Sequence, residues 1–279
     1  MIRIVLIILK KIYLRLWFKI NSKKGNIHLD SGTAILKKIP FTKYTCYLRP
    51  TISDSSRVSE FVNGIYTSKN YLHQKLQELK PNILIDIGGN IGLASLNLVS
   101  EFSSLKEVIG IEAEKFNFNM LKLNYNHFTN LFKNIKFNPL YALASCESGN
   151  SVITNKSLSE LGEKVTSSGT FRFTPENQNH LNAGTIKTIS LNDVLRNLTD
   201  QDKLIVKIDI EGGEEYLFEK NTQWVKKVMF LTIEIHDRYN IELLNSSSNF
   251  IKMLAENNFS IVPENDVIHC YNRSLINYN

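Results

Sequence analysis

Residues 82–93 read NILIDIGGNIGL, an apolar run that contains one acid, Asp86, and leads into a glycine-rich turn. An apolar run of this length, bounded by glycines, is typical of a strand that is buried on both faces of a sheet. Gly88 and Gly92 allow a tight turn and a close start of the next helix, since glycine accepts positive φ at no steric cost. The stretch therefore predicts a strand, a ligand-binding loop and a helix, with Asp86 and Asn90 as its polar groups.

Apolar runs alternate with helical patterns from residue 81 onward. This alternation predicts an α/β fold of the Rossmann-like type, with a parallel sheet covered by helices on both faces. Such sheets bind ligands beyond the carboxyl ends of their strands, so we expect the chemistry directly after Ile87, Ile111, Ile210 and Ile235. The expected strands are residues 82–88, 107–113, 134–143, 203–212, 228–237, 259–264 and 267–272, and the expected helices are residues 70–79, 90–102, 114–126, 214–225 and 249–258.

The chain divides by composition into a basic N-terminus, a lead-in and one α/β domain. Residues 1–25 predict a basic amphipathic helix, and residues 26–80 predict an irregular cap with strand-like pieces and a polar stretch at 51–56. Residues 81–279 form the predicted α/β domain. Within it, residues 145–184 are rich in serine, threonine, asparagine and glycine, which predicts an inserted β-hairpin or flap.

The net charge of +6 is located at the N-terminus. Residues 1–29 carry seven of the 33 lysines and arginines and no acid, whereas the rest of the chain has 26 bases and 27 acids. The neutral body argues against a nucleic-acid partner, which would need a basic patch on the folded surface. A basic helix that also carries tryptophan and phenylalanine can lie in a membrane interface. Packing on the domain, packing on a second copy and a nucleic-acid arm are alternative uses of residues 1–20.

Cysteine usage and the N-terminal stretch indicate a cytoplasmic protein. Cys46, Cys146 and Cys270 are scattered and odd in number, which favours free thiols in a reducing compartment. The apolar run at residues 4–9 is far shorter than the roughly 20 residues that span a bilayer. No pair of histidines or cysteines has the spacing of a metal site, so we expect no zinc. The sequence predicts a cytoplasmic chain that contacts the inner face of the membrane through residues 1–20.

The glycine loop favours a cationic ligand over a dinucleotide. The dinucleotide pattern G-x-G-x-x-G, laid on residues 87–92, puts Ile87 at the first glycine position. Asp86 would also face the pyrophosphate, and two negative groups repel each other. S-adenosylmethionine carries a sulfonium and an ammonium and no phosphate, so it suits this acid.

Further cofactor contacts are expected after the second strand. Glu112, 26 residues after Asp86, can accept both ribose hydroxyls of NAD or of S-adenosylmethionine, so it does not discriminate between them. Phe116 and Asn117 follow where an adenine would be flanked, and ordinary helix positions are the alternative. The predicted cofactor-binding residues are Asp86, Gly88, Asn90, Gly92, Glu112 and Asn117.

Five ordered blocks lie within residues 80–240. They read LIDIGGNIGLASL, VIGIEAEKFNFNMLKLN, ISLNDVL, LIVKIDIEGGEEYLFE and FLTIEIH. Together they resemble the FkbM-type methyltransferases. The resemblance implies a class I S-adenosylmethionine-dependent fold with seven strands, the last antiparallel, and the cofactor over the first two. It also implies O-methylation of a saccharide, a glycolipid precursor or a related small metabolite.

Two positions depart from the pattern of that family. Asn192 and Asp193 stand where the family usually has two acids, and the turn at 211–214 reads EGGE where the family reads EGAE. Neither position touches the cofactor loop, so both departures concern the acceptor and leave methyl transfer unaffected.

The ends of the later strands supply the candidates for catalysis. Asp209 and Glu211, and likewise Glu234 and His236, are two residues apart and share a face of an extended segment. In one hypothesis, His236 or Asp209 removes the proton of a hydroxyl as a general base. In another, some of Asp209, Glu211 and Glu234 bind a divalent cation that lowers the pKa of the hydroxyl. Positioning without a base is a third hypothesis, and Lys207 is expected only to cover the sheet edge.

Two other classes of function stay open. An NAD(P)-binding oxidoreductase would need pyrophosphate donors that the loop lacks, and a non-catalytic, membrane-associated interaction protein would bind no cofactor. Nucleic-acid methylation is disfavoured by the neutral body and by the absence of an N/D-P-P-Y/F-like motif. The sequence leaves the oligomeric state open.

Overall fold

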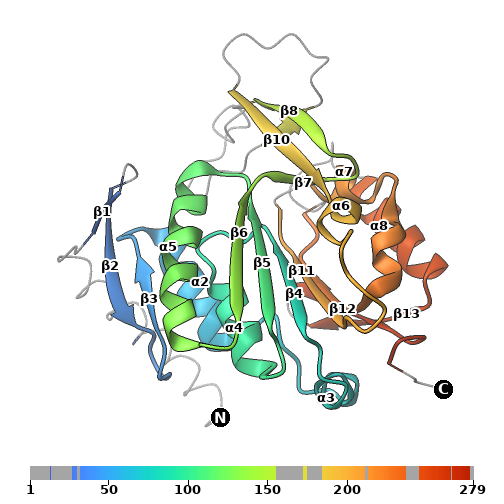
Figure 1. The fold of residues 1–279 in the computed structure, drawn as a ribbon, viewed down its shortest axis with the longest axis horizontal. Helices are drawn as coiled ribbons and strands as arrows, with labels where there is room; N and C mark the ends of the chain where they lie inside the picture. Colours follow the sequence, from blue (N-terminus) through green and yellow to red (C-terminus); the bar gives the residue numbers. More distant parts are fainter. Residues whose placement is uncertain are drawn as a thin grey trace.

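The computed structural model describes residues 13, 27–29, 32–154, 172–174, 184–210, 213–236, 245–264 and 266–276 (Figure 1). The central strands are β4 (Ile83–Ile87), β5 (Glu107–Glu112), β6 (Lys136–Tyr141), β11 (Leu204–Ile208), β12 (Val228–Ile233), β13 (Phe259–Glu264) and β14 (Val267–Asn272). They form one seven-stranded sheet in the order β13-β14-β12-β11-β4-β5-β6. β14 is antiparallel to both of its neighbours, and the other pairs are parallel. The expected α/β fold with seven strands and an antiparallel last strand is confirmed.

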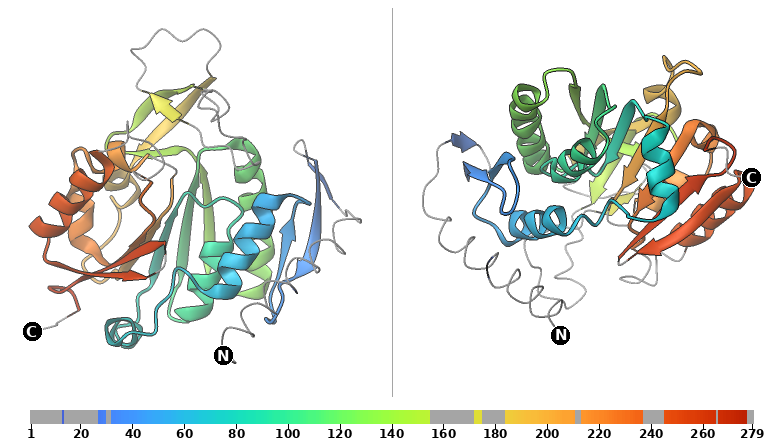
Figure 2. Two further views of the ribbon diagram at one scale, coloured as in Figure 1. Left: turned by 180° about the vertical axis from the view of Figure 1, so that it is seen from behind. Right: turned by 90° about the horizontal axis from the view of Figure 1, so that it is seen from below.

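Helices cover both faces of this sheet (Figure 2). One layer holds α2 (Ile52–Asn63), α3 (Tyr71–Glu78), α4 (Leu93–Glu101) and α5 (Lys115–Leu131), and the other holds α6 (Leu191–Val194), α7 (Glu214–Phe218), the 3-10 helix η2 (Thr222–Lys227) and α8 (Asn245–Glu256). Strand side chains alternate between the layers, as their period of two requires. Leu84 packs in the layer of α4 and α5, whereas Ile83 and Ile85 pack in the layer of α6 to α8.

The expected single helix at residues 214–225 is divided into two. α7 ends at Phe218, and η2 begins at Thr222. Between them Asn221 has a φ of 57°, a left-handed conformation that a continuing α-helix cannot contain. The period of the apolar residues continues through the break, so the pattern alone predicts one helix.

Helix α2 begins inside the polar stretch that the sequence predicts to be irregular, and that prediction is wrong. Thr51 is the N-cap, and its hydroxyl accepts the amide of Asp54 at 3.2 Å. Gly64 ends the helix in the left-handed conformation, with a φ of 65°. Threonine, serine and aspartate are common both in loops and at helix starts, so the composition of 51–56 was ambiguous.

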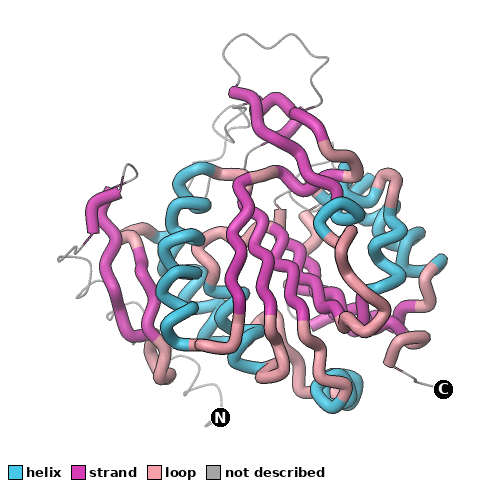
Figure 3. Tube along the Cα trace, viewed as in Figure 1, coloured by secondary structure: helices cyan, strands magenta, loops and turns pink. Residues whose placement is uncertain are grey.

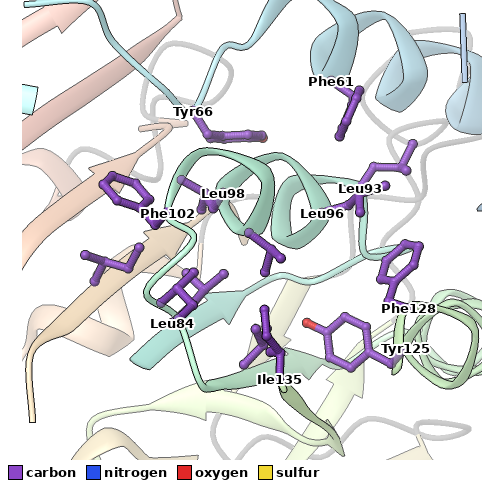
Figure 4. Close-up of a cluster of buried hydrophobic side chains, with 14 of the residues drawn as sticks. Phe61, Tyr66, Leu84, Leu93, Leu96, Leu98, Phe102, Tyr125, Phe128 and Ile135 are labelled. Atoms are coloured by element: carbon purple, nitrogen blue, oxygen red, sulfur yellow. The ribbon is translucent and has the colours of Figure 1, made fainter. Parts of the chain in front are cut away.

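Helix α2 packs on α4 and covers the centre of the domain. Figure 4 shows Phe61 and Tyr66, from the N-terminal lead-in, on one side of α4, and Leu84 of β4 on its other side. Seen from behind, α2 lies in front of α4 (Figure 2). The lead-in is therefore part of the same hydrophobic core as the central sheet.

Three short strands join the lead-in to α5. β1 (Ile27–Leu29), β2 (Gly32–Lys38) and β3 (Thr45–Leu48) form an antiparallel sheet beside α5. Asn124 of α5 is fully buried and connects three segments. Its side chain accepts the amide of Tyr47 at 2.6 Å and donates to the carbonyls of Tyr47 and Ile91 at 3.0 and 2.7 Å. One amide side chain thus fixes β3 and the glycine loop against the same helix.

A second small sheet follows β6. Its strands are β7 (Leu143–Ser145), β8 (Gly149–Thr154), β9 (Arg172–Thr174) and β10 (Gly184–Ser190), in the order β7-β10-β8-β9. In Figure 3 it stands at the end of the molecule where the central strands have their carboxyl ends. Residues 155–171 and 175–183 of the insertion lie outside the described residues.

Most of the N-terminal segment also lies outside the described residues. Tyr13 is described, and its ring centroid lies 5.1 Å from that of Phe41. The predicted amphipathic helix and its membrane contact therefore stay predictions. Among the helices that the structure describes, none is long and apolar enough to cross a membrane.

Replacement of Gly88 by alanine tests the tight turn after β4. Gly88 has a φ of 76°, and an added Cβ would lie 1.7 Å from the carbonyl oxygen of Asp209. We expect Gly88→Ala to lower the free energy of unfolding by about 3 kcal/mol or more, measured by urea or thermal denaturation. Gly149→Ala is the control, because its Cβ would meet only the Thr188 hydroxyl at 3.6 Å. Equal stability of the two variants would contradict the turn geometry.

Candidate active site

The glycine loop is fixed to the end of β5 by hydrogen bonds. The amides of Gly88 and Gly89 both donate to the carbonyl of Ile111, each at 2.9 Å. Asn90 has a φ of 48°, so the chain turns sharply after the two glycines. Glu112 closes the loop from the side of β5, because its carboxylate accepts the amide of Asn90 at 2.7 Å.

Glu112 is a buried carboxylate with a shifted pKa. Its second oxygen accepts the amide of Glu114 at 2.7 Å. Burial raises the pKa of Glu112 to about 7, against the opposing effect of the two amide donors. The strength of Glu112 as a hydrogen-bond acceptor therefore changes near neutral pH.

Asp86 is fully buried at the end of β4 and is bonded within the fold. The hydroxyl of Ser95 on α4 donates to Oδ2 at 2.5 Å and lies 2.6 Å from the hydroxyl of Tyr125. Oδ1 lies 3.2 Å from Nζ of Lys207. Asp86 thus links β4, α4 and β11.

Lys207 occupies the centre of the site, and the expectation that it covers the sheet edge is wrong. Its side chain is 2% exposed, and β11 lies between β4 and β12. Nζ donates to the carbonyl of Gly88 at 2.7 Å and lies 3.7 Å from Oδ2 of Asp209. Burial alone would lower the pKa of Lys207, but the carboxylates of Asp86 and Asp209 outweigh it and raise the pKa. Lys207 is therefore a buried cation between two acids.

Asp209 is surrounded by donors that favour its ionised form. The hydroxyl of Tyr66 donates to Oδ2 at 3.1 Å, and Nη1 of Arg57 lies 3.2 Å from the same oxygen. Burial by itself would raise the pKa of Asp209, but Lys207, Arg57 and His236 together lower it to about 2. Two of these partners, Arg57 and Tyr66, come from the N-terminal lead-in.

His236 lies among three carboxylates. Its Nδ1 is 2.7 Å from Oε1 of Glu214, which is fully buried in the first turn of α7. Its Nε2 is 3.7 Å from Oδ1 of Asp209 and 3.8 Å from Oε1 of Glu234. One donor atom each of Asp209, Glu234 and His236 lies within 4.8 Å of the others, so the three can share one ligand or cation.

A narrow cleft connects the glycine loop with this cluster. It is lined by Arg57 and Tyr66 from the lead-in, by residues 88–91 of the loop, and by Lys207 and Asp209 from the end of β11. Asp209 therefore belongs to both the cleft and the His236 cluster.

Comparison with known proteins identifies the family. A family model described as the methyltransferase FkbM domain matches residues 86–261, which is more than half of the 279 residues. The chain belongs to the FkbM methyltransferase family. The match begins at Asp86 and ends in β13, so it includes the glycine loop and the His236 cluster. A search of curated proteins gave no match.

Solved structures that are similar to this FkbM-family chain include proteins described as methyltransferases. Methyltransferase FkbM from Methylobacillus flagellatus KT is 14% identical, with a TM-score of 0.42. The aligned part is 78% of this chain and only 60% of that one. An O-methyltransferase from Bacillus cereus in complex with SAH is 11% identical, with a TM-score of 0.40, and the aligned part is 77% of this chain and 89% of that one. TYW2 from M. jannaschii in complex with AdoMet is 11% identical, with a TM-score of 0.37, and the aligned part is 88% of this chain and 86% of that one.

The predicted site residues of the FkbM-family chain fall into two groups. Asp86, Gly88, Asn90, Gly92 and Glu112 lie together at the ends of β4 and β5, and Asp209, Glu234 and His236 lie together at the ends of β11 and β12. Asn117 stands in the first turn of α5, where its Oδ1 accepts Nη2 of Arg49 at 2.8 Å. Glu211 lies outside the described residues, so its predicted role stays a prediction.

Sequence analysis missed four groups that shape the site: Lys207, Glu214, Arg57 and Tyr66. A signal existed for Lys207, because a lysine within an apolar strand is seldom buried without a partner. In the observed register Lys207 lies directly beside Asp86, and the two side chains share a face of the sheet. No comparable signal marked Arg57 or Tyr66, since their contacts depend on where the lead-in folds.

Replacement of Lys207 by methionine tests the buried cation. The variant leaves Asp86 and Asp209 as buried acids without the ammonium between them, so we expect the free energy of unfolding to fall by roughly 3–5 kcal/mol. Asp86→Asn in the same chain should restore part of the loss. Lys226→Met, at an exposed position, should change stability by less than about 0.5 kcal/mol. Denaturant titration measures all three, and a wild-type stability for Lys207→Met would exclude this role.

Proposed function

We propose that the chain transfers the methyl group of S-adenosylmethionine to an oxygen of a saccharide, a glycolipid precursor or a related small metabolite. The observation that carries this proposal is the glycine loop whose Asn90 amide is held by Glu112 at the end of β5, in a chain that belongs to a methyltransferase family. The acceptor class rests on the resemblance to the FkbM-type methyltransferases, which sequence blocks from residue 84 to 236 support.

The acids around the glycine loop fit a methyl donor that is cationic and free of phosphate. Asp86 and Glu112 stand at the ends of β4 and β5, and Asp209 lines the cleft together with Arg57 and Lys207. Asn90 Oδ1 is a buried acceptor without a hydrogen-bond partner among the described residues. S-adenosylmethionine supplies a methyl group that its sulfonium has already activated. Glu112 accepts ribose hydroxyls in this proposal, and Gly88 leaves space for close approach to the loop backbone.

The acceptor oxygen would meet the second group of residues. Lys207, Arg57 and Tyr66 hold Asp209 in its ionised form, and Glu214 orients the imidazole of His236. Asp209 can then accept a hydrogen bond from the acceptor hydroxyl and orient it, and His236 can receive its proton. Glu234 lies at the more open side of this cluster, with 17% of its side chain exposed.

The segments around the domain would supply acceptor recognition. The lead-in already contributes Arg57 and Tyr66 to the cleft, and the small sheet of β7 to β10 stands at the same end of the molecule as the site. In this proposal residues 1–20 hold the protein at a membrane surface, where glycolipid precursors are found.

Ligand binding separates methyl transfer from nicotinamide chemistry. We expect S-adenosylhomocysteine at about 100 times its Kd to stabilise the chain by roughly 2.7 kcal/mol, and NAD to give no thermal shift. Glu112→Ala should weaken the binding of S-adenosylhomocysteine at least about tenfold, measured by calorimetry, because two ribose hydroxyls lose their charged acceptor. Glu107→Ala, at the opposite end of β5, is the matched control. A shift with NAD and none with S-adenosylhomocysteine would overturn the proposal.

The pKa of Glu112 predicts a pH dependence of the same binding. Because burial raises this pKa to about 7, the carboxyl gains a proton as the pH falls below 7 and becomes a weaker acceptor for hydroxyls. The affinity for S-adenosylhomocysteine should therefore fall between pH 7.5 and pH 5.5, by up to about tenfold per pH unit below 7. Glu112→Gln should bind more weakly and show a flatter profile. Parallel profiles for wild type and variant would assign the dependence to another group.

A further inference from the structure

The cluster of Asp209, Glu234 and His236 has the composition and geometry of a cation site. Asp209 follows β11, and Glu234 and His236 follow β12, the next strand in the sheet. The backbone amide of Glu234 donates to the carbonyl of Ile208 at 3.1 Å, so the pairing of the two strands continues to the cluster. The three donor atoms lie within 4.8 Å of one another, and Asp209 and His236 are buried. The ends of two paired strands therefore bring one nitrogen donor and two oxygen donors close together.

A fourth residue orients the histidine. Glu214 Oε1 lies 2.7 Å from Nδ1 of His236, and a carboxylate beside this nitrogen favours the tautomer with the proton on Nδ1. The lone pair of Nε2 then faces Asp209 and Glu234, as a metal-binding imidazole requires. A carboxylate behind a histidine is the usual arrangement at metal sites. Oε2 of Glu214 is buried without a hydrogen-bond partner among the described residues, and Oε1 makes the contact with His236.

The two oxygens of Asp209 have different neighbours, and Oδ1 is the one that faces His236. Arg57, Tyr66 and Lys207 are all nearest to Oδ2, whereas Oδ1 lies toward His236. Around the cluster and the neighbouring loop, the described groups include four carboxylates, Asp86, Asp209, Glu214 and Glu234, and two permanent cations, Lys207 and Arg57. Excess negative charge in a buried site favours the binding of a divalent cation.

We propose that Asp209, Glu234 and His236 bind a divalent cation that accepts both imidazole and carboxylate ligands, such as Mn²⁺, and that this cation binds the acceptor hydroxyl. The role in catalysis rests on the proposed methyl transfer. Three protein ligands leave coordination positions open, and the partly exposed Glu234 marks the open side. With the cation bound, the Nε2 lone pair of His236 is a ligand and no longer the base, so the bound hydroxyl gives its proton to solvent. Its oxygen then forms the new C–O bond while the C–S bond of the donor breaks, and the electron pair stays on sulfur.

Titration of the full chain with Mn²⁺ alone tests the site. After removal of metals with a chelator, electron paramagnetic resonance of free Mn²⁺ should show one bound ion per chain. His236→Ala and Glu234→Gln should each weaken binding at least about tenfold. Glu78→Gln, an exposed acid on α3, is the control for binding to surface carboxylates and should leave the affinity unchanged. A folded wild-type chain that binds no Mn²⁺, or equal binding by all four proteins, would overturn the proposal.

Glu214 is a positioning residue, and a pair of variants separates this role from simple destabilisation. Glu214→Leu should weaken Mn²⁺ binding about tenfold. Glu214→Gln, whose amide oxygen still accepts Nδ1–H of His236, should keep most of the wild-type affinity. Equal loss in both variants would contradict the orientation of His236. Calorimetry with S-adenosylhomocysteine on the metal-free chain tests the proposed function separately. Mn²⁺ binding without S-adenosylhomocysteine binding would reject the methyltransferase proposal and keep the cation site, and the opposite result would reject only the cation site.

Discussion

The ammonium of Lys207 lies between the carboxylates of Asp86 and Asp209, and the rest of the site is arranged around this contact. Two acids at the ends of adjacent parallel strands repel each other strongly in a buried environment. A cation from β11, on the same face of the sheet, allows both acids to stay ionised. Lys207 also donates to the carbonyl of Gly88, so the same contact holds the glycine loop in place.

Asp209 connects the two halves of the site. On one side it lines the cleft with the glycine loop, and on the other it faces His236 and Glu234. The two halves differ in electrostatics, since burial raises the pKa of Glu112 to about 7 while neighbouring cations lower that of Asp209 to about 2. A carboxyl that titrates near neutral pH therefore stands beside the loop, and one that is ionised at neutral pH stands in the cluster with His236 and Glu234.

The lead-in is a structural part of the domain, although the family match begins only at Asp86. Helix α2 packs on α4. Arg57 of α2 and Tyr66, which follows α2, both contact Asp209. Arg49, paired with the buried Asp54, reaches Asn117 at the start of α5. Residues before the matched range thus complete the charge balance of groups inside it, and removal of the lead-in would expose Asp209 and part of the core.

The sequence by itself determined the strands, the glycine loop and most of the acids at the strand ends, because apolar periodicity and glycine spacing are local properties of the chain. The sequence therefore predicts that Asp86, Glu112, Asp209 and His236 lie at the ends of strands, where the structure has them, and their roles in a site stay predictions. Only the tertiary structure decided that Lys207 stands between Asp86 and Asp209 and that Glu214 stands behind His236. Those contacts depend on the pairing of β11 with β4 and on the position of α7 beside the end of β12. They join residues that are distant in the sequence, so no local pattern encodes them.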